Sequence, residues 1–219
     1  MKEGAATWSI LQKSRGSDTC LVIGNGPSLR NVQREFLDKY DSLGSNRIYL
    51  KFSPTFYVSV NPLVIEQCID DIIHLDSAAK FIGGGFAARV PGAYELISRP
   101  MPHFAREPWN GIYEGFTVTY VCLQIAFFMG YQTVLLVGVD HRFLFEGAPN
   151  QEKVLQGDDP NHFDPNYFKG MRWNNPDLER SALAYEMART VFEASGRRIF
   201  NLTEGTALEV FEKGNIDEW

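Results

Sequence analysis

The chain has 219 residues, of which 44% are hydrophobic, and its 21 Lys and Arg residues against 27 Asp and Glu residues give a formal net charge of −6. A chain of this length can bury one sizeable core, so we expect a single domain over residues 1–219. The acidic balance, with no block of basic residues, argues against sequence-independent nucleic-acid binding.

The cysteines and the apolar runs indicate the compartment. Cys20, Cys68 and Cys122 lack the spacing of a metal site or a disulfide framework, which favours buried thiols in a reducing cytoplasm. The N-terminal stretch has no signal-peptide core, and the longest apolar runs are too short to cross a bilayer. We therefore expect a cytoplasmic protein without a transmembrane segment, and homo-oligomer formation stays open.

The first half of the chain alternates between helix and strand patterns. Apolar spacing predicts helices over residues 5–13, 31–40 and 63–75, with Val32, Phe36 and Leu37 of the second facing inward. Short apolar runs predict strands at "TCLVIG" (19–24), "RIYLKF" (47–52), "PTFYVSV" (54–60) and "AKFIG" (79–83). Residues 83–109 are rich in Gly and Pro and are expected to form loops and short edge strands.

The second half contains the clearest unit of the chain. Residues 117–129 predict a helix that is apolar around its whole circumference and capped by Gly130, and "TVLLVGVD" (133–140) predicts a buried strand. Residues 142–175 have weak periodicity, so we expect a lid or loop insertion with a functional role. A closing helix is predicted between Pro176 and Gly196, and "RRIFNLT" (197–203) predicts a last strand.

This alternation predicts a Rossmann-like α/β fold, with a doubly wound, mainly parallel sheet and helices on both faces. In such folds ligands bind at the carboxyl ends of the strands, beside the point where the strand order reverses. Polar clusters that follow buried strands are therefore the candidates for a functional site.

The first cluster is "LVIGNGPSL" (21–29), where a buried strand runs into a glycine-rich turn. Glycines allow the backbone to approach a ligand, and the following helix would direct unpaired N–H groups at an anion. The pattern is neither a dinucleotide fingerprint nor a P-loop, so a tight structural turn is the alternative. We favour a nucleotide-phosphate loop, because the asparagine between the glycines has no packing reason; its candidate residues are Gly24, Asn25, Gly26, Pro27 and Ser28.

The second cluster is Asp140 and His141, at the polar end of the strand predicted over 133–140. An acid and an imidazole at a strand end can bind a metal, hydrogen-bond a ribose or transfer protons. The plain alternative is that Asp140 caps a loop.

The third cluster is "GDDPNHFDPNYF" (157–168), in the expected lid. It gathers Asp158, Asp159, His162, Asp164 and Tyr167, and a functional role for His162 weighs as much as a plain surface position. The aromatic residues of this region could stack on a sugar or a pterin; they are Phe163, Tyr167, Phe168 and Trp173.

The motifs "LVIGNGPSL", "GSNRIYL", "GFTVTYVCLQIAFFMGYQTVLLVGVDHRF" and "NHFDPNYF" carry a resemblance over residues 19–211. In order and spacing the chain resembles the family described as 6-hydroxymethylpterin diphosphokinase MptE-like, also known as domain of unknown function 115. Relatives of that family include flagellin-modifying motility accessory factors and, more distantly, the bacterial sialyltransferases of glycosyltransferase family 42.

The resemblance implies roles for individual residues. In the sialyltransferases the "GNGPSL"-like loop and an asparagine after the second strand hold the nucleotide of a CMP-sugar, which corresponds here to residues 24–29 and Asn46. The donor-contacting residues that open the central helix correspond to Thr117 and Thr119, although the sialyltransferase Ser-Gly pair is absent. A lid histidine that acts as general base corresponds to His162. No tyrosine matches those that support the leaving phosphate, so Arg142 or Tyr167 replaces that support, or the reaction differs.

Three functions follow as alternatives. The favoured one is a sialyltransferase-like, nucleotide-sugar-dependent glycosyltransferase of surface glycan or glycoprotein assembly, with His162, Asp140 and His141 as catalytic candidates. It needs no cofactor and pairs a nucleotide-sugar donor with a small-molecule or glycan acceptor. The second is a pterin-type diphosphokinase that uses ATP and Mg²⁺, with Asp140, Asp158 and Asp159 as metal ligands. The third is a non-catalytic nucleotide- or sugar-binding protein.

Overall fold

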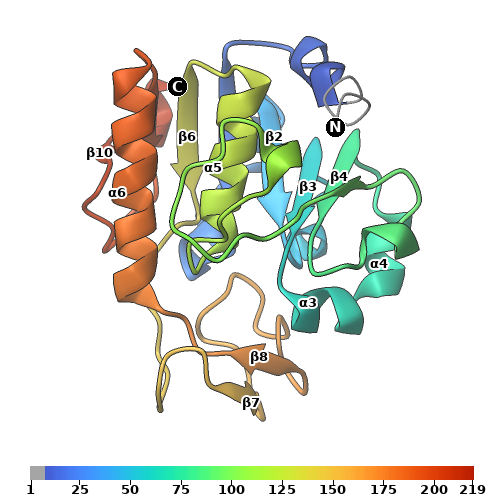
Figure 1. Cartoon of the computed structure of the whole chain (residues 1–219). Helices are drawn as coiled ribbons and strands as arrows, with labels where there is room; N and C mark the ends of the chain where they lie inside the picture. Colours follow the sequence, from blue (N-terminus) through green and yellow to red (C-terminus); the bar gives the residue numbers. More distant parts are fainter. Residues whose placement is uncertain (1–7) are drawn as a thin grey trace.

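The computed structural model describes residues 8–219 and contains an eight-stranded parallel sheet with helices on both faces (Figure 1). The strand order is β10-β9-β6-β1-β2-β3-β4-β5. The strands are β1 (Thr19–Ile23), β2 (Asp41–Ser45), β3 (Phe56–Ser59), β4 (Ala79–Ile82), β5 (Tyr94–Glu95), β6 (Thr133–Val137), β9 (Arg198–Asn201) and β10 (Glu212–Lys213). This confirms the predicted Rossmann-like α/β class.

The strand order reverses beside β1. From β1 the chain adds β2, β3, β4 and β5 in one direction, and it then returns to place β6, β9 and β10 on the other side. Cys20 of β1 is accordingly in register with Asp41 of β2 and with Val134 of β6. The switch point of this doubly wound sheet therefore lies between β1 and β6.

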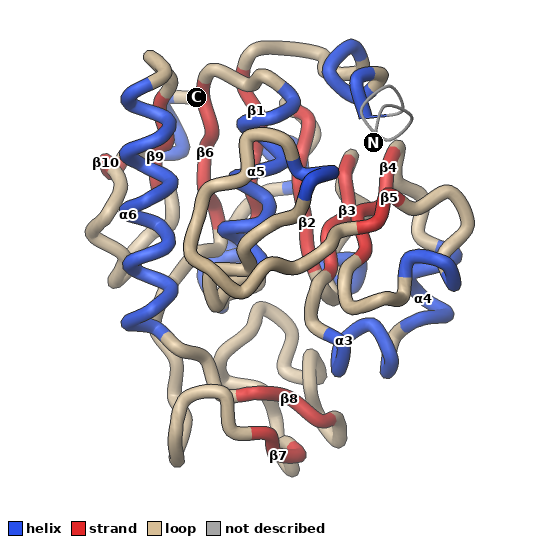
Figure 2. Tube along the Cα trace, in the orientation of Figure 1, coloured by secondary structure: helices blue, strands red, loops and turns tan. Residues whose placement is uncertain are grey.

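One face of the sheet is covered by α5 (Val118–Met129) and α6 (Leu178–Ala194), with the 3₁₀ turns η1 (Leu11–Lys13) and η5 (Pro108–Asn110) (Figure 2). All residues of α5 after Val118 are buried, which agrees with its apolar circumference. Gly130 ends the helix in the left-handed conformation, with φ 93°, as predicted. α6 begins after Asp177, whose side chain accepts a hydrogen bond from the Arg180 amide.

The opposite face carries shorter elements. They are η2 (Pro27–Asn31), α2 (Arg34–Leu37), η3 (Ile48–Leu50), α3 (Pro62–Gln67) and α4 (Ile69–His74), and their buried side chains share one core with Leu21, Ile23 and Tyr57 of the sheet. Further 3₁₀ turns are η4 (Ala87–Arg89) and η6 (Ile216–Glu218). Within residues 142–175, β7 (Glu152–Val154) and β8 (Arg172–Asn174) form an antiparallel hairpin.

Several predicted boundaries were wrong. Residues 47–52, which were expected to form a strand, contain the 3₁₀ turn η3 instead. The strand between β1 and β3 is β2, which was not predicted. The helix expected over 31–40 is only α2; Phe36 and Leu37 are buried as predicted, but Val32 is only partly covered. The helix over 63–75 is interrupted at Cys68.

The N-terminal helix prediction falls partly outside the described residues, because 5–7 are not described and Leu11–Lys13 form a 3₁₀ turn. The strands predicted around 54–60, 79–83, 133–140 and 197–203 are confirmed as β3, β4, β6 and β9. All three cysteines are buried and free. Over residues 8–219, no helix has both the length and the apolar character that crossing a bilayer requires.

Candidate functional site

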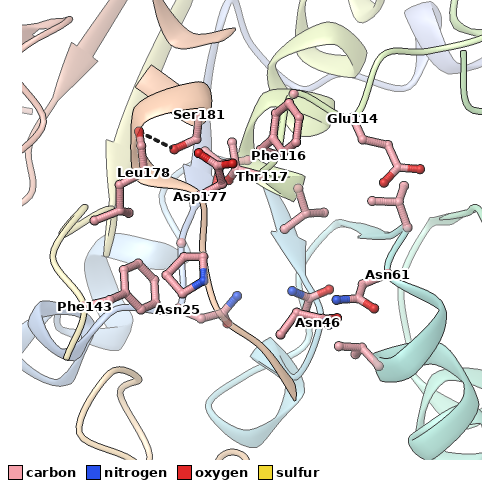
Figure 3. A pocket seen from close by; sticks show the side chains of 18 of the residues that line it. Asn25, Asn46, Asn61, Glu114, Phe116, Thr117, Phe143, Asp177, Leu178 and Ser181 are labelled. Carbon is pink, nitrogen blue, oxygen red and sulfur yellow. Dashed lines mark hydrogen bonds between the residues drawn. The ribbon is translucent and has the colours of Figure 1, made fainter. Parts of the chain in front are cut away.

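A cavity of about 790 Å³ opens at the carboxyl ends of β1, β2, β3 and β6, at the switch point of the sheet. The first turns of α5 and α6 and part of segment 142–175 complete its wall (Figure 3). This volume lies in the range of about 300–1,000 Å³ that is usual for small-molecule and cofactor sites. The cavity brings together ten predicted site residues: Gly24, Asn25, Gly26, Asn46, Thr117, Thr119, Asp140, His141, Arg142 and His162.

Three asparagines follow neighbouring strands along one side of this cavity (Figure 3). Asn25 follows β1, and its Nδ2 donates to the carbonyl oxygen and the hydroxyl of Ser45 at 3.2 and 3.3 Å, whereas its buried Oδ1 has no hydrogen-bond partner among residues 8–219. Asn46 follows β2, and its Oδ1 accepts from the Ser59 hydroxyl at 3.4 Å. Asn61 follows β3 and caps α3 by accepting from the Leu63 amide at 2.9 Å. The row presents amide groups, which can both donate to and accept from a ligand.

The loop after β1 differs from the expected phosphate loop in its backbone hydrogen bonds. The amides of Gly24 and Gly26 donate to the carbonyls of Val137 and Gly138 at 2.8 and 2.9 Å. The Ser28 amide donates to Asp140 Oδ1 at 3.1 Å, so a carboxylate of the protein itself occupies the start of η2. Pro27 and Ser28 lie outside the cavity wall, while Gly24, Asn25 and Gly26 form part of it.

Asp140 and His141 have different surroundings although they are neighbours in sequence. Asp140 caps the loop after β1, which is the plain structural role considered for it. His141 is half-buried, and this burial lowers the pKa of its imidazole from the ordinary value of 6.5. The ring packs edge-on against Tyr185 with centroids 6.0 Å apart. His141 is therefore a neutral imidazole at neutral pH.

The N-terminus of α5 also faces the cavity. Thr117 precedes the helix, and its hydroxyl lies 3.2 Å from that of Tyr185. Within the described part of the chain, the amides of Val118 and Thr119 have no hydrogen-bond acceptor. A twelve-residue helix carries a partial positive charge at such an end, which favours an anionic group of a ligand.

His162 is held by a carboxylate and by an aromatic ring. Its Nδ1 lies 2.8 Å from Oδ2 of Asp159, whose side chain is 2% exposed, while the His162 side chain is 12% exposed. The imidazole stacks on Tyr167 with ring centroids 4.1 Å apart and an interplanar angle of 4°. Nε2 has no partner among residues 8–219, so with Nδ1 protonated toward Asp159 it is the basic nitrogen.

Tyr167 itself does not reach the cavity. It is fully buried, and its hydroxyl accepts a hydrogen bond from the Arg47 amide at 2.9 Å. Arg142 does line the cavity, with Nη2 3.4 Å from the Gly205 carbonyl. Among the lid aromatics, Phe168 and Trp173 contribute to the cavity wall, whereas Phe163 belongs to the core and is absent from that wall.

The three carboxylates considered as Mg²⁺ ligands do not share a site. Asp140 binds Ser28, Asp159 binds His162 and the Asn161 amide, and Asp158 is exposed and binds Lys169 Nζ at 2.8 Å. The hydrogen bond and charge of Lys169 lower the pKa of Asp158. Over the described residues, no group of three or more His, Cys, Asp or Glu side chains is arranged to hold a metal. These residues do not fit the Mg²⁺ site that was considered.

Strained backbone gathers at the same cavity. In the described part of the chain, the non-glycine residues with positive φ are Asn46 (51°), Phe116 (59°), His141 (52°) and Asn150 (63°), and all four line it. Such conformations cost about 1–3 kcal/mol each and concentrate at functional sites. The strain indicates that the fold holds the cavity wall in a defined shape.

Sequence reasoning missed part of the cavity wall. Asn61 had a local signal, since an asparagine before a proline that opens a helix is a typical N-cap. Other polar wall residues that were not predicted come from segments without a recognisable motif; they include Arg99, Glu114, Asn150, Asn175, Asp177, Ser181 and Tyr185.

Comparisons with known proteins place the fold. No protein-family model matches the chain, and no curated protein sequence matches it. Among solved structures, the chain is similar to a MAf glycosyltransferase from Magnetospirillum magneticum AMB-1, with 12% sequence identity and a TM-score of 0.57. The similarity covers 100% of this chain and 39% of the MAf chain, so this chain spans well under half the length of that protein. At this identity the likeness shows a common α/β fold.

Proposed function

We propose that this chain is a glycosyltransferase-like enzyme that takes a nucleotide-sugar as donor and transfers the sugar to a hydroxyl group of a small molecule or glycan. The observation that carries the proposal is the His162–Asp159 pair at the wall of a large cavity above the switch point. The fold likeness to a MAf glycosyltransferase supports the proposal, because it extends over the full length of this chain. The matched part is 39% of the MAf chain.

The proposed chemistry needs no cofactor. A nucleotide-sugar already carries a phosphate leaving group, so the protein must hold the donor, stabilise the charge that leaves and remove a proton from the acceptor. Asn25, Asn46 and Asn61 supply amide groups for the base and ribose, and the free amides of α5 stabilise the departing phosphate. Nε2 of His162 takes the acceptor proton while Asp159 stabilises the resulting imidazolium.

A finer assignment belongs to the same proposal. We propose kinship with the MptE-like family and its sialyltransferase relatives, a cytoplasmic location, and a place in surface glycan or glycoprotein assembly. The diphosphokinase alternative is less well supported, because Asp140, Asp158 and Asp159 bind separate partners and do not form a common donor set. A non-catalytic binding protein differs from our proposal in that it would not need His162 as a base.

Ligand-induced stabilisation tests the proposal. Thermal unfolding is measured with CMP, UDP, GDP and ATP, each with and without Mg²⁺, and the hydrolysis of the corresponding nucleotide-sugars is followed by NMR. We expect one nucleotide to stabilise the protein without metal and its sugar conjugate to be hydrolysed slowly. His162→Gln is expected to keep the nucleotide affinity and to slow hydrolysis by about 10²–10⁴-fold.

The outcomes separate the alternatives. Stabilisation by ATP that depends on Mg²⁺ would favour the diphosphokinase. Binding without turnover, unaffected by His162→Gln, would favour a non-catalytic binding protein. If no nucleotide changes the melting temperature, both enzyme hypotheses are wrong. His74→Gln, in an exposed helix end outside the cavity, is the matched histidine control.

A further inference from the structure

The loop after β1 is bonded to the main chain of His162. Arg30, near the end of η2, donates from Nε to the Phe163 carbonyl at 2.7 Å and from Nη2 to the His162 carbonyl at 2.9 Å. The Phe163 amide in turn donates to the Asn25 carbonyl at 3.0 Å. Three hydrogen bonds therefore join the dipeptide of His162 and Phe163 to a loop that is more than 130 residues earlier in the chain.

The hydrogen bonds from the loop after β1 hold the main chain of His162, whereas other contacts hold its imidazole ring. Asp159 and Tyr167 orient the imidazole through Nδ1 and through the stacked face. Neither contact ties the segment to the strand ends where the asparagine row lies, because both residues belong to the same segment as His162. Arg30 and the Asn25 carbonyl supply that connection, since they lie on the loop that follows β1.

A second arginine holds the same segment further along. Arg47, which follows β2, donates from Nη1 to the Tyr167 carbonyl, and its guanidinium lies 5.7 Å from the Tyr167 ring centroid. Arg47 is partly covered and its Nε is buried, so its replacement would disturb the core. Arg30 is exposed, and among residues 8–219 its side chain donates only to main-chain carbonyls, so it can be replaced without opening the core.

We propose that Arg30 is a positioning residue: its bidentate hydrogen bonds to the carbonyls of His162 and Phe163 set the place of the base relative to the donor-binding loop. Asn25 belongs both to the cavity wall and to this connection, so the same loop would contact the donor and hold the main chain beside His162. Binding of the donor and the position of the base are then coupled, as in any pair of sites that bias one element. This inference rests on the proposed function for its catalytic meaning, but its structural part can be tested without substrate.

The substrate-free test follows the four histidines by NMR of the Cε1–H groups in the whole chain, with the His162 signal assigned from His162→Gln. We expect Arg30→Ala to shift or broaden the His162 resonance and to leave those of His74 and His103 unchanged. Arg34→Ala is the matched control, because Arg34 is also an exposed arginine, lies on the next helix and pairs with Asp38. An unchanged His162 resonance in Arg30→Ala would overturn the proposal, whatever reaction the protein catalyses.

The kinetic test uses the nucleotide-sugar that the wild-type protein hydrolyses in the panel of CMP-, UDP- and GDP-sugars. Arg30→Ala is expected to lower kcat at least tenfold with KM changed less than twofold, and millimolar guanidinium is expected to restore part of kcat. A rise in KM as large as the fall in kcat, or a kcat that guanidinium does not restore, would show a structural role only and would contradict the positioning role. If the wild-type protein hydrolyses none of these donors, the proposed function fails, and the NMR result still decides the place of Arg30.

Discussion

The carboxylate of Asp140 binds Ser28 twice, since Oδ1 lies 3.1 Å from the Ser28 amide and Oδ2 lies 2.7 Å from its hydroxyl. This contact joins the loops that follow β1 and β6 across the switch point of the sheet. It also explains the second glycine of the loop, because a Cβ at Gly26 would lie 1.9 Å from Asp140 Oδ2.

Gly26→Ala is therefore expected to destabilise the protein by about 1–3 kcal/mol, because Asp140 must move away and lose its bonds to Ser28. The free energy of unfolding from urea titrations measures this loss. Gly157→Ala is the control, since, apart from its two chain neighbours, no described residue has an atom within 4 Å of the added Cβ, and a change of less than about 0.5 kcal/mol is expected there. Equal stability of the two variants would show that the loop accommodates a side chain at position 26.

Asp159→Asn is expected to reduce donor hydrolysis by about 10²–10⁴-fold, because an amide no longer fixes the Nδ1–H form of His162 or stabilises its cation. The direct measurement is the rate of donor hydrolysis at saturating donor, with the nucleotide affinity measured beside it. Asp158→Asn is the paired control, since Asp158 is exposed and, within the described residues, binds only Lys169. A rate unaffected by Asp159→Asn would remove His162 as the base.

His141 gives the fold a pH dependence of known sign. Burial lowers its pKa in the folded state below 6.5, so the unfolded chain binds a proton more readily in the window just below that value. The stability that depends on neutral His141 is complete above pH 6.5 and is lost progressively as the pH falls toward the lower folded value. His141→Asn keeps a residue that tolerates φ 52°. Urea unfolding at pH 7.5 and 5 should show a smaller loss of stability in this variant than in the wild type; the same loss in both would contradict the assignment.

Substitutions of Phe116, which lines the cavity, can measure the backbone strain there. In the interior of a helix or strand, glycine lowers protein stability relative to alanine by about 0.5–1 kcal/mol. At position 116, however, φ is 59°, which costs an L-residue about 1–2 kcal/mol and costs glycine little. We therefore expect Phe116→Gly to be more stable than Phe116→Ala, although both lose the contact of the ring with Arg180, 5.0 Å away. Thermal unfolding of the two variants measures the difference, and the usual order would show that the strain is relieved by other means.

Secondary structure could be predicted from the sequence where apolar runs are long, but not where tertiary contacts determine the conformation. α5 and β6 followed from their unbroken hydrophobicity. β2 escaped recognition because Ser42, Gly44 and Ser45 have weak strand propensity; their burial between β1 and β3 comes from the sheet and not from their own pattern. Gly44 fits there because a Cβ would lie 2.9 Å from Pro54.

The site was partly predictable for a similar reason. Residues just after strands could be placed at the sheet edge from the fold class alone, and Asn46 does follow β2 directly even though that strand was assigned elsewhere. The contacts of Arg30 and Arg47 with segment 142–175 were not predictable, because each joins positions more than 100 residues apart without a local motif. Those contacts make the segment around His162 part of the strand-end architecture.

The position of β1 between β2 and β6 has a consequence for how the protein folds. Strands β1 to β5 can pair in the order in which the chain emerges, but Ser28 and Asp140, 112 residues apart, become neighbours only when β6 inserts on the far side of β1. Pairing over such separations carries a large loop-closure cost and is slow. We therefore expect the cavity to be completed late in folding, because a chain that ends before β6 has the asparagine row and the start of α5 but lacks the wall residues between Gly138 and Tyr185.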